Sequence, residues 1–219
     1  MEVRLNARAT SLRVLMTIVA AAFCPTPSAA NDNQLYTVPV AQTQTPKQWQ
    51  EFCKHHPEDC KSAATAATEV KLTVLAWFKL IAINRKVNGS IMAKTDRAHW
   101  HVEDRWDYPD DGFGDCEDYA LLKRRRLIEA GFPVGALMLT VVWTKQNHGH
   151  AVLLVRTDSG DLALDSERTE ILHWTRTGYR FVKRQRAARP NDWVYIDGVS
   201  PGPALVSASS RRAAAAQPN

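Results

Sequence analysis

The sequence predicts an α+β fold in which N-terminal helices pack on an antiparallel β-sheet. Helix-type patterns fill the first part of the chain up to residue 130, and β-prone runs bounded by turn residues fill residues 136–196. Helices that precede the strands, and do not alternate with them, favour an antiparallel sheet over a parallel one. A hydrophobic content of 45% in 219 residues is enough for the core of one domain with flanking segments.

Charge and hydropathy argue against two classes of protein. The net charge of +5 is modest, and the basic run at residues 124–126 has no interleaved aromatic residues, so a nucleic-acid-binding groove is not indicated. No apolar run reaches the ~20 residues that a membrane-spanning helix needs. We therefore expect no membrane span in the mature chain.

Residues 1–30 have the pattern of a secretory signal peptide. Three arginines within the first 13 residues form a basic start, residues 14–23 are largely apolar, and Ser28-Ala-Ala30 offers the small residues of a cleavage site. Cys24 does not indicate a lipoprotein, because the preceding Phe23 is larger than the residue usual before a lipidated cysteine. We expect cleavage after Ala30 and a periplasmic or secreted protein.

Composition divides the remaining chain into three parts. Residues 31–44 are polar and are expected to form an irregular lead-in, and residues 201–219 are expected to form a disordered tail. The folded domain is predicted to cover residues 45–200.

Two helices are predicted before the central motif. Thr45 and Pro46 mark the start of a short helix over 47–56, which ends before Pro57. A longer helix is predicted over 61–88. Apolar residues expected to face the core recur along it at helical spacing, namely Val70, Val74, Trp77, Phe78 and Ile81.

The short helix carries Cys53, and Cys60 follows shortly after it. The break at Pro57 allows Cys60 to turn back, so in an oxidising compartment these two cysteines are predicted to form a disulfide. The alternative is a zinc site that adds His55 or His56, but a fourth ligand is missing.

Cys116 is the candidate nucleophile. Once Cys24 is removed with the signal peptide and two cysteines are paired, Cys116 is the one left free. It lies in Gly114-Asp-Cys-Glu-Asp-Tyr-Ala120, at or just before the first turn of a helix predicted to end at residue 130. A helix N-terminus favours a thiolate. A buried structural cysteine is the alternative interpretation.

The flanking acids, Asp115 and Glu117, disfavour a thiolate by their negative charge. Cys116 therefore needs a positive partner, and a histidine is the first candidate. By themselves, the two acids are equally well explained as capping groups at the helix N-terminus.

His150 and Asp165 complete the candidate set. Strands are predicted over 136–143, 150–156, 161–165, 179–182 and 193–196. His150 opens the second strand and Asp165 closes the third, so a hairpin brings them to one end of the sheet. A loop of two or four residues would turn both side chains to the same side.

An imidazole oriented by a carboxylate is what thiol chemistry requires. His148, two residues earlier, is the competing base.

These motifs resemble the bacterial transglutaminase-like cysteine proteinases, which include the LapG-type periplasmic peptidases. The resemblance covers roughly residues 45–197. It is carried by the Gly-Asp-Cys-Glu-Asp-Tyr-Ala block, by His150-Ala-Val-Leu153 and by Leu164-Asp165, with support from 83–88, 104–106 and 178–185. One departure is Ser166, where the family pattern usually has Asn.

The resemblance implies a papain-like, transglutaminase-type core with a catalytic triad of Cys116, His150 and Asp165. It also implies calcium held beside the nucleophile by Asp115 and Glu117. The implied substrate is a periplasmic or cell-surface protein such as an adhesin, and an inner-membrane receptor is the implied regulatory partner.

Two alternatives remain open. A transglutaminase would use the same triad but transfer the acyl group to an amine instead of water. A non-catalytic periplasmic binding module would keep the fold, although a pure binder has no chemical need for all three residues.

Overall fold

A computed structural model describes residues 34–63 and 67–196. The predicted signal peptide at 1–30, the cleavage site after Ala30 and the predicted tail at 201–219 lie outside the described residues. Within the described ranges, no helix is both long and apolar enough to cross a membrane.

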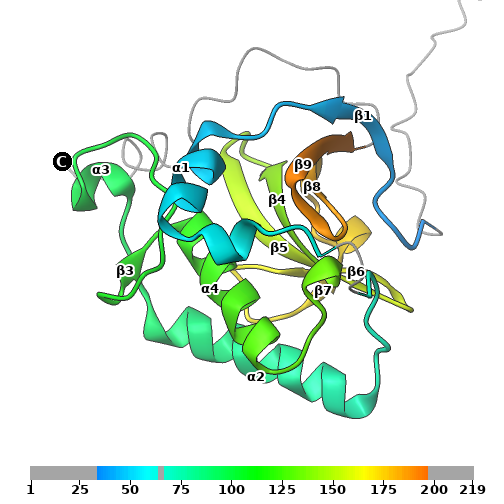
Figure 1. The fold of residues 1–219 in the computed structure, drawn as a ribbon. Coiled ribbons are helices and arrows are strands. Elements are labelled where there is room, and N and C mark those ends of the chain that lie inside the picture. Colours follow the sequence, from blue (N-terminus) through cyan, green and yellow to red (C-terminus); the bar gives the residue numbers. More distant parts are fainter. Residues whose placement is uncertain (1–33, 64–66, 197–219) are drawn as a thin grey trace, which may run out of the picture. The chain divides into compact units, whose positions relative to one another are not determined.

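The central element is a seven-stranded sheet with the order β1-β9-β8-β4-β5-β6-β7 (Figure 1). Every neighbouring pair in it is antiparallel, as predicted. Its strands are β1 (Pro39–Thr43), β4 (Leu137–Trp143), β5 (Gly149–Thr157), β6 (Gly160–Leu164), β7 (Leu172–His173), β8 (Arg180–Arg186) and β9 (Arg189–Ile196). A separate parallel pair joins β2 (Met92–Ala93) to β3 (Phe113–Gly114).

The α-helices precede all strands of this sheet except β1, and α4 packs on the sheet, which confirms the predicted α+β class. They are α1 (Lys47–His55), α2 (Val74–Ser90), α3 (Asp96–His99) and α4 (Cys116–Glu129), with short 3₁₀ turns at Pro57–Cys60, Val134–Ala136 and Trp174–Arg176. Helix α4 contacts β4 and β5, and α2 packs against α4 along its outer side (Figure 1).

Strand alternation divides the buried apolar residues between the two faces of the sheet. Leu139, Leu153 and Val155 belong to the larger cluster, which includes residues of α1, α2 and α4. Met138 and Val152, their neighbours in sequence, belong to a smaller cluster that includes Trp174 and Phe181. The sheet is therefore buried on both faces, which fixes the register of its central strands.

The disulfide predicted between Cys53 and Cys60 is present, with the two Cα atoms 5.7 Å apart. It joins the last turns of α1 to the 3₁₀ turn that follows Pro57. Because both sulfur atoms are used in this bond, the alternative zinc site is ruled out.

The prediction of an irregular lead-in over 31–44 is wrong for part of that stretch. Residues 39–43 form β1, which pairs with β9 at one edge of the sheet. The strand presents little hydrophobic alternation because its side chains are mostly exposed, and its pairing partner is about 150 residues away, so no local signal marks it. Thr45 also does not cap α1, since its hydroxyl donates to the carbonyl oxygen of Asn191.

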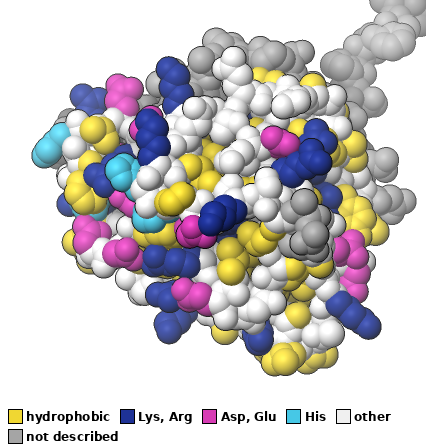
Figure 2. All heavy atoms as spheres, viewed as in Figure 1, with side chains coloured by type: hydrophobic (Ala, Val, Ile, Leu, Met, Phe, Trp, Pro, Cys, Tyr) yellow, Lys and Arg dark blue, Asp and Glu magenta, His cyan; other side chains and the backbone are white. Residues whose placement is uncertain are grey.

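The helix predicted over 61–88 begins only at Val74. Thr73 caps it by accepting the Ala76 N–H at 3.1 Å, and Val70 is instead bridged to Thr157 at the sheet. The predicted set of core residues is wrong in part: Val74 and Phe78 are 74% and 61% exposed, whereas Trp77 is partly buried against the core. Figure 2 shows hydrophobic side chains gathered over this end of α2. The buried face carries Leu80, Asn84 and Val87.

Candidate active site

Cys116 is the first residue of α4, where backbone N–H groups lack intrahelical partners. The turn before it is held by Asp118, whose carboxylate accepts the N–H of Asp115 at 3.3 Å and the N–H of Asp107 at 2.9 Å. A Cβ atom at Gly114 would lie 2.8 Å from the Asp118 side chain, so glycine is required for this close approach. The motif around Cys116 thus fixes the start of α4.

The thiol of Cys116 is held in its protonated form. Its Sγ atom donates to the Oε2 atom of Glu117 at 3.0 Å. Burial raises the pKa of Cys116 well above its ordinary value, and the charges of Glu117 and Asp115 add to this effect. The backbone N–H of Ala151 interacts with the sulfur and lowers the pKa in part. The sulfur therefore lies against the start of β5, beside the residue that follows His150.

His150 and Asp165 are in direct contact. The Nε2 atom of His150 lies 2.8 Å from the Oδ1 atom of Asp165, and both residues are 3% exposed. A two-residue turn joins β5 to β6, and Leu153 pairs with Leu164 in the hairpin. Asp165 follows directly after that pair and so lies on the same side as His150. This is the geometry that a two-residue loop was predicted to give.

Asp165 is bound through both of its carboxylate oxygens. Oδ1 also accepts the N–H of Glu167 at 3.0 Å, and Oδ2 accepts the Tyr179 hydroxyl at 2.6 Å. The Nε atom of Arg168 lies 3.6 Å from Oδ2. Burial opposes ionisation, but the contacts with His150, Tyr179 and Glu167 together hold the pKa of Asp165 at about 2. Asp165 is therefore a carboxylate at neutral pH.

Two asparagines on α2 anchor the loop that carries Asp165. The side-chain amide of Asn88 donates to the carbonyl oxygens of Asp165 at 2.9 Å and Arg168 at 2.8 Å. One turn earlier, the Asn84 amide donates to the carbonyl oxygen of Thr169 at 3.1 Å. The side chain of Asn84 is fully buried, so α2 fixes this loop from inside the protein.

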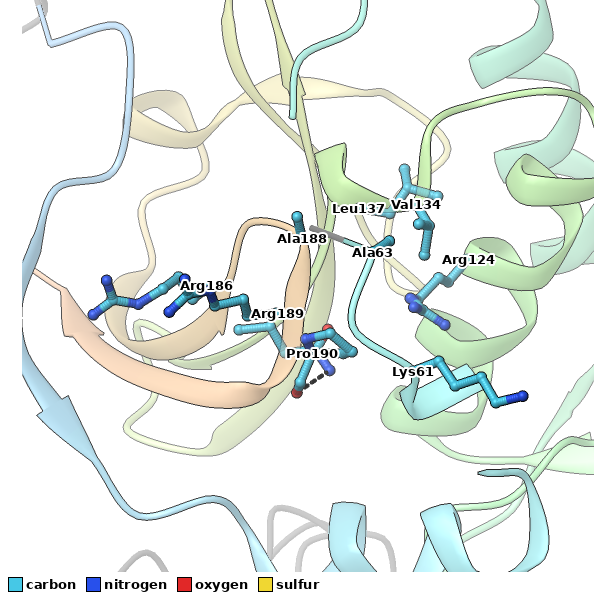
Figure 3. A pocket seen from close by; sticks show the side chains of 10 residues that line it. Lys61, Ala63, Arg124, Val134, Leu137, Arg186, Ala188, Arg189 and Pro190 are labelled. Atoms are coloured by element: carbon cyan, nitrogen blue, oxygen red, sulfur yellow. Dashed lines mark hydrogen bonds between the residues drawn. The ribbon is translucent and has the colours of Figure 1, made fainter. Parts of the chain in front are cut away.

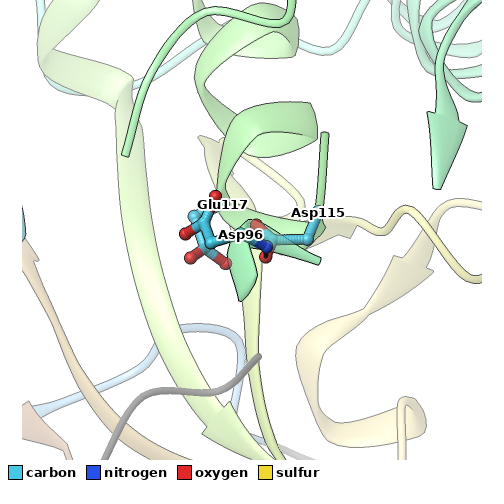
Figure 4. Close-up of side chains that lie close together, drawn as sticks. All are labelled: Asp96, Asp115 and Glu117. Carbon is cyan, nitrogen blue, oxygen red and sulfur yellow. Dashed lines mark hydrogen bonds between the residues drawn. The ribbon is translucent and has the colours of Figure 1, made fainter. Parts of the chain in front are cut away.

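Four acids meet beside Cys116. Carboxylate oxygens of Asp96, Asp115 and Glu117 lie within 4.8 Å of one another (Figure 4). Asp104 also interacts with Glu117. One carboxylate oxygen each of Asp104, Asp115 and Glu117 is buried without a hydrogen-bond partner. Asp96 comes from α3, Asp104 from the following loop, and the other two from the start of α4.

The acids of this cluster hold their protons more tightly than exposed carboxyl groups do. Burial, followed by mutual repulsion, raises the pKa of Asp96 to about 6 and that of Asp115 to about 7, and raises the pKa of Glu117 well above its ordinary value. Buried oxygen ligands without hydrogen bonds are the donor set that a hard cation such as Ca²⁺ takes. The cluster therefore fits a metal ion.

Two hollows lie near these elements. A cleft of about 400 Å³ between α1 and residues 102–107 is bordered by Asp104, Trp106 and His56, so it reaches one acid of the cluster.

A much smaller pocket is lined by Arg124, Gln185 and Pro190 (Figure 3). The smaller one has room for about one water molecule, which excludes it as a substrate site.

Residues 40–200 match the model of a protein family described as bacterial transglutaminase-like cysteine proteinase. The match covers more than half of the chain. The chain belongs to this family. Its fold is accordingly transglutaminase-like, and the chain is related to bacterial cysteine proteinases. No curated protein matches the chain.

Three solved structures of Legionella pneumophila LapG are similar to the proteinase. One structure of LapG is 29% identical, with a TM-score of 0.45, and the match covers 52% of this chain and 65% of the LapG chain. The structure of the EGTA-treated form has the same identity and TM-score, and that match covers 52% of this chain and 64% of the LapG chain. The chain thus spans less than two thirds of the length of the LapG chain in these two structures. The calcium-bound form is 25% identical over 76% of this chain and 86% of that chain, with a TM-score of 0.48.

The sequence predicted Cys116, His150, Asp165, Asp115 and Glu117 as site residues. The fold places the first three near the start of α4, the start of β5 and the end of β6. Sequence reasoning missed two acids of the cluster, Asp96 and Asp104, because both lie in a polar connector with no periodic pattern. It also missed the partners of Asp165 other than His150. A signal existed for Asn84 and Asn88, which are polar residues one turn apart on a largely apolar helix.

Proposed function

We propose that the proteinase is an exported cysteine peptidase that hydrolyses a peptide bond with Cys116 as nucleophile, His150 as base and Asp165 as the group that orients His150. The observation that carries the proposal is a pair of contacts. The Cys116 sulfur lies against the N–H of Ala151, and the adjacent His150 bonds to Asp165 at 2.8 Å.

The carboxylate of Asp165 determines which nitrogen of His150 carries the proton. Because a carboxylate only accepts hydrogen bonds, Nε2 of neutral His150 must be the protonated nitrogen. Nδ1 is then the unprotonated nitrogen and the atom available to take a proton from the Cys116 thiol.

In the first half of the reaction, the Cys116 sulfur forms a bond to the carbonyl carbon of the peptide while His150 takes the thiol proton. Backbone N–H groups at the start of α4, including that of Cys116, are suited to stabilise the negative carbonyl oxygen. His150 then gives its proton to the amine as the C–N bond breaks, which leaves a thioester on Cys116.

In the second half, water attacks the thioester carbon and His150 accepts a proton from that water. The C–S bond breaks, the acid product leaves, and the thiol regains its proton. If an amine attacked in place of water, the same intermediate would give transglutamination, so the identity of the product distinguishes these two reactions.

We propose that Asp96, Asp115 and Glu117, with Asp104 at the same cluster, hold a calcium ion. The support is the set of buried carboxylate oxygens without hydrogen-bond partners. A bound divalent cation would offset the negative charges that disfavour the Cys116 thiolate. Release of Glu117 from its hydrogen bond with the thiol would also leave Sγ available to His150.

The proposed location is the periplasm or the exterior of the cell, because the N-terminal sequence reads as a signal peptide and the domain contains a disulfide. The proposed substrate is a periplasmic or cell-surface protein cut in an extended segment. An inner-membrane receptor that controls the peptidase is proposed from the family resemblance alone.

The test is cleavage of a library of unfolded peptides by the wild-type chain with calcium, read by mass spectrometry in H₂¹⁸O. Peptide-bond hydrolysis adds one ¹⁸O atom to the new carboxyl terminus. A parallel reaction contains a primary amine. Products with ¹⁸O that are absent with the Cys116→Ala variant support a peptidase, and amine adducts in their place support a transglutaminase. Equal products from both proteins would contradict the proposal.

A further inference from the structure

We propose that Tyr179 and Arg168 are positioning residues that hold the Asp165 carboxylate in the orientation that serves His150. This inference rests on the peptidase function proposed above. Neither residue touches Cys116 in the described structure, so their effect on the reaction would pass through Asp165.

Tyr179 contacts both members of the His150–Asp165 pair. Its hydroxyl donates to the Oδ2 atom of Asp165 at 2.6 Å, and its ring meets the His150 ring edge to face with 5.6 Å between centroids. Burial and the hydrogen bond with Asp165 raise the pKa of Tyr179 above its ordinary value. Tyr179 is therefore a protonated donor at neutral pH.

Arg168 forms an ion pair with the same oxygen. Its Nε atom is 3.6 Å from Asp165 Oδ2, and its guanidinium lies over the Tyr179 ring, 5.2 Å from the centroid. The backbone of Arg168 is itself fixed, because its carbonyl oxygen accepts the Asn88 amide at 2.8 Å. The guanidinium and the Tyr179 hydroxyl therefore approach Oδ2 from a rigid frame.

These contacts remove the rotational freedom of the carboxylate. With Oδ2 occupied by Tyr179 and Arg168, Oδ1 is the oxygen left for His150 and the Glu167 N–H. A carboxylate held at one oxygen only could rotate about its Cβ–Cγ bond, and the His150 ring would then turn with it. The fixed carboxylate is what keeps Nδ1 of His150 directed to its proton-transfer partner.

Lys123, a buried residue of α4, is a further cation whose charge interacts with Asp165. Its Nζ atom is fully buried and has no hydrogen-bond partner among the described residues. It therefore influences Asp165 through charge alone and does not fix the direction of either oxygen. The orienting role falls to Tyr179 and Arg168.

The kinetic test is a double-mutant cycle of Tyr179→Phe and Asp165→Asn on the peptide that the wild type cuts fastest. Tyr179→Phe should lower kcat by about 10-fold to 100-fold, the effect of one hydrogen bond to a charged group, and leave KM unchanged. In the Asp165→Asn background, Tyr179→Phe should lower kcat little further, because the carboxylate that Tyr179 binds has already been replaced. Arg168→Gln should lower kcat by less, and Arg168→Lys should restore part of the loss.

A spectroscopic test needs no substrate. The Nε2–H proton of His150 should give a slowly exchanging low-field signal in ¹⁵N-histidine-labelled protein, assigned by its loss in His150→Ala. Tyr179→Phe should broaden this signal or speed its exchange. The matched control is Tyr36→Phe, which removes a hydroxyl that donates to Glu69 instead of Asp165 and should change nothing.

Two results would overturn the inference. One is a Tyr179→Phe variant with an unchanged His150 Nε2–H signal and an unchanged kcat. The other is a fall in kcat on Tyr179→Phe that is equally large in the wild-type and Asp165→Asn backgrounds. Failure of the proposed function looks different, since then the wild type and Cys116→Ala would cut the peptides equally while the signal still responded to Tyr179→Phe.

Discussion

The Nε2 atom of His150 is 2.8 Å from Asp165 Oδ1, at the end of the β5–β6 hairpin opposite its two-residue turn. The contact joins the proposed base to the acid proposed to orient it, inside a domain whose sheet is buried on both faces. It also makes the ionisation of Asp165 part of the stability of the fold.

Asp165 is predicted to stabilise the fold only above acidic pH. Its pKa is lowered from 3.8 to about 2, so its contribution is fully present above pH 4 and is lost as the pH falls through about 2. The contribution amounts to at most about 2 kcal/mol in the free energy of unfolding. Urea unfolding of wild type and Asp165→Asn should differ at pH 6 and converge as the pH falls through about 2. Asp192→Asn, at an exposed ion pair, is the control. A difference between wild type and Asp165→Asn that persists unchanged to a pH below about 2 would contradict this assignment.

Cys116 is predicted to be the only cysteine of the mature chain that reacts with iodoacetamide without reductant. The other two, Cys53 and Cys60, are joined in a disulfide. Because burial and Glu117 raise the pKa of Cys116, labelling should be slow at neutral pH and should speed up when the protein is unfolded. Peptide mapping by mass spectrometry measures the sites, and label on Cys53 in the folded protein would show the prediction to be wrong.

Calcium is predicted to raise the melting temperature. A cation that binds only the folded state at 100 times its Kd adds about 2.7 kcal/mol, which is on the order of 5–10 °C for a domain of this size. Melts of the wild type in EGTA and in excess calcium measure the shift. Asp96→Asn and Asp115→Asn should each reduce it, because each removes a charged ligand.

The matched control for this prediction is Glu129→Gln, which lies on the same helix as Glu117 but forms an exposed ion pair with Arg126. This variant should keep the full calcium shift. Identical wild-type melts in EGTA and calcium would mean that the acids serve as helix caps and not as ligands.

Loss of Asp59 is predicted to destabilise the fold far more than loss of an exposed acid. Asp59 lies beside the disulfide and accepts hydrogen bonds from Arg124, whose side chain is 1% exposed. Asp59→Ala would leave this guanidinium with fewer partners, at a cost of about 3 kcal/mol in the free energy of unfolding. Glu51→Ala, which breaks an exposed pair with Lys54, should cost less than about 1 kcal/mol. Chemical denaturation compares them, and equal losses would contradict the argument.

The sequence was sufficient for the features that rest on local patterns. The start of α4 at Cys116, the β5–β6 hairpin and the Cys53–Cys60 bond each follow from turn residues, strand periodicity or cysteine spacing within about 15 residues. The antiparallel arrangement of the sheet followed from the order of helices before strands along the chain.

The features that sequence reasoning missed depend on contacts between distant residues. Strand β1 exists because β9 provides its hydrogen-bond partners. Helix α2 turns Leu80 and Val87 inward, and not Val74 or Phe78, because Leu80 and Val87 pack in clusters with residues of α4. Asp96 joins the acid cluster through the fold, since it is 19 residues from Asp115. Periodicity within one segment does not determine such contacts.

The most direct measurement of the central claim is the rate of peptide hydrolysis by four variants with calcium present. Cys116→Ala and His150→Ala should each lower kcat by about 10⁴-fold or more, and Asp165→Asn should lower it less, because Asp165 orients the base and does not act on the substrate. His148→Ala should retain near-wild-type activity. Hydrolysis that survives Cys116→Ala, or that is lost in His148→Ala and kept in His150→Ala, would contradict the account.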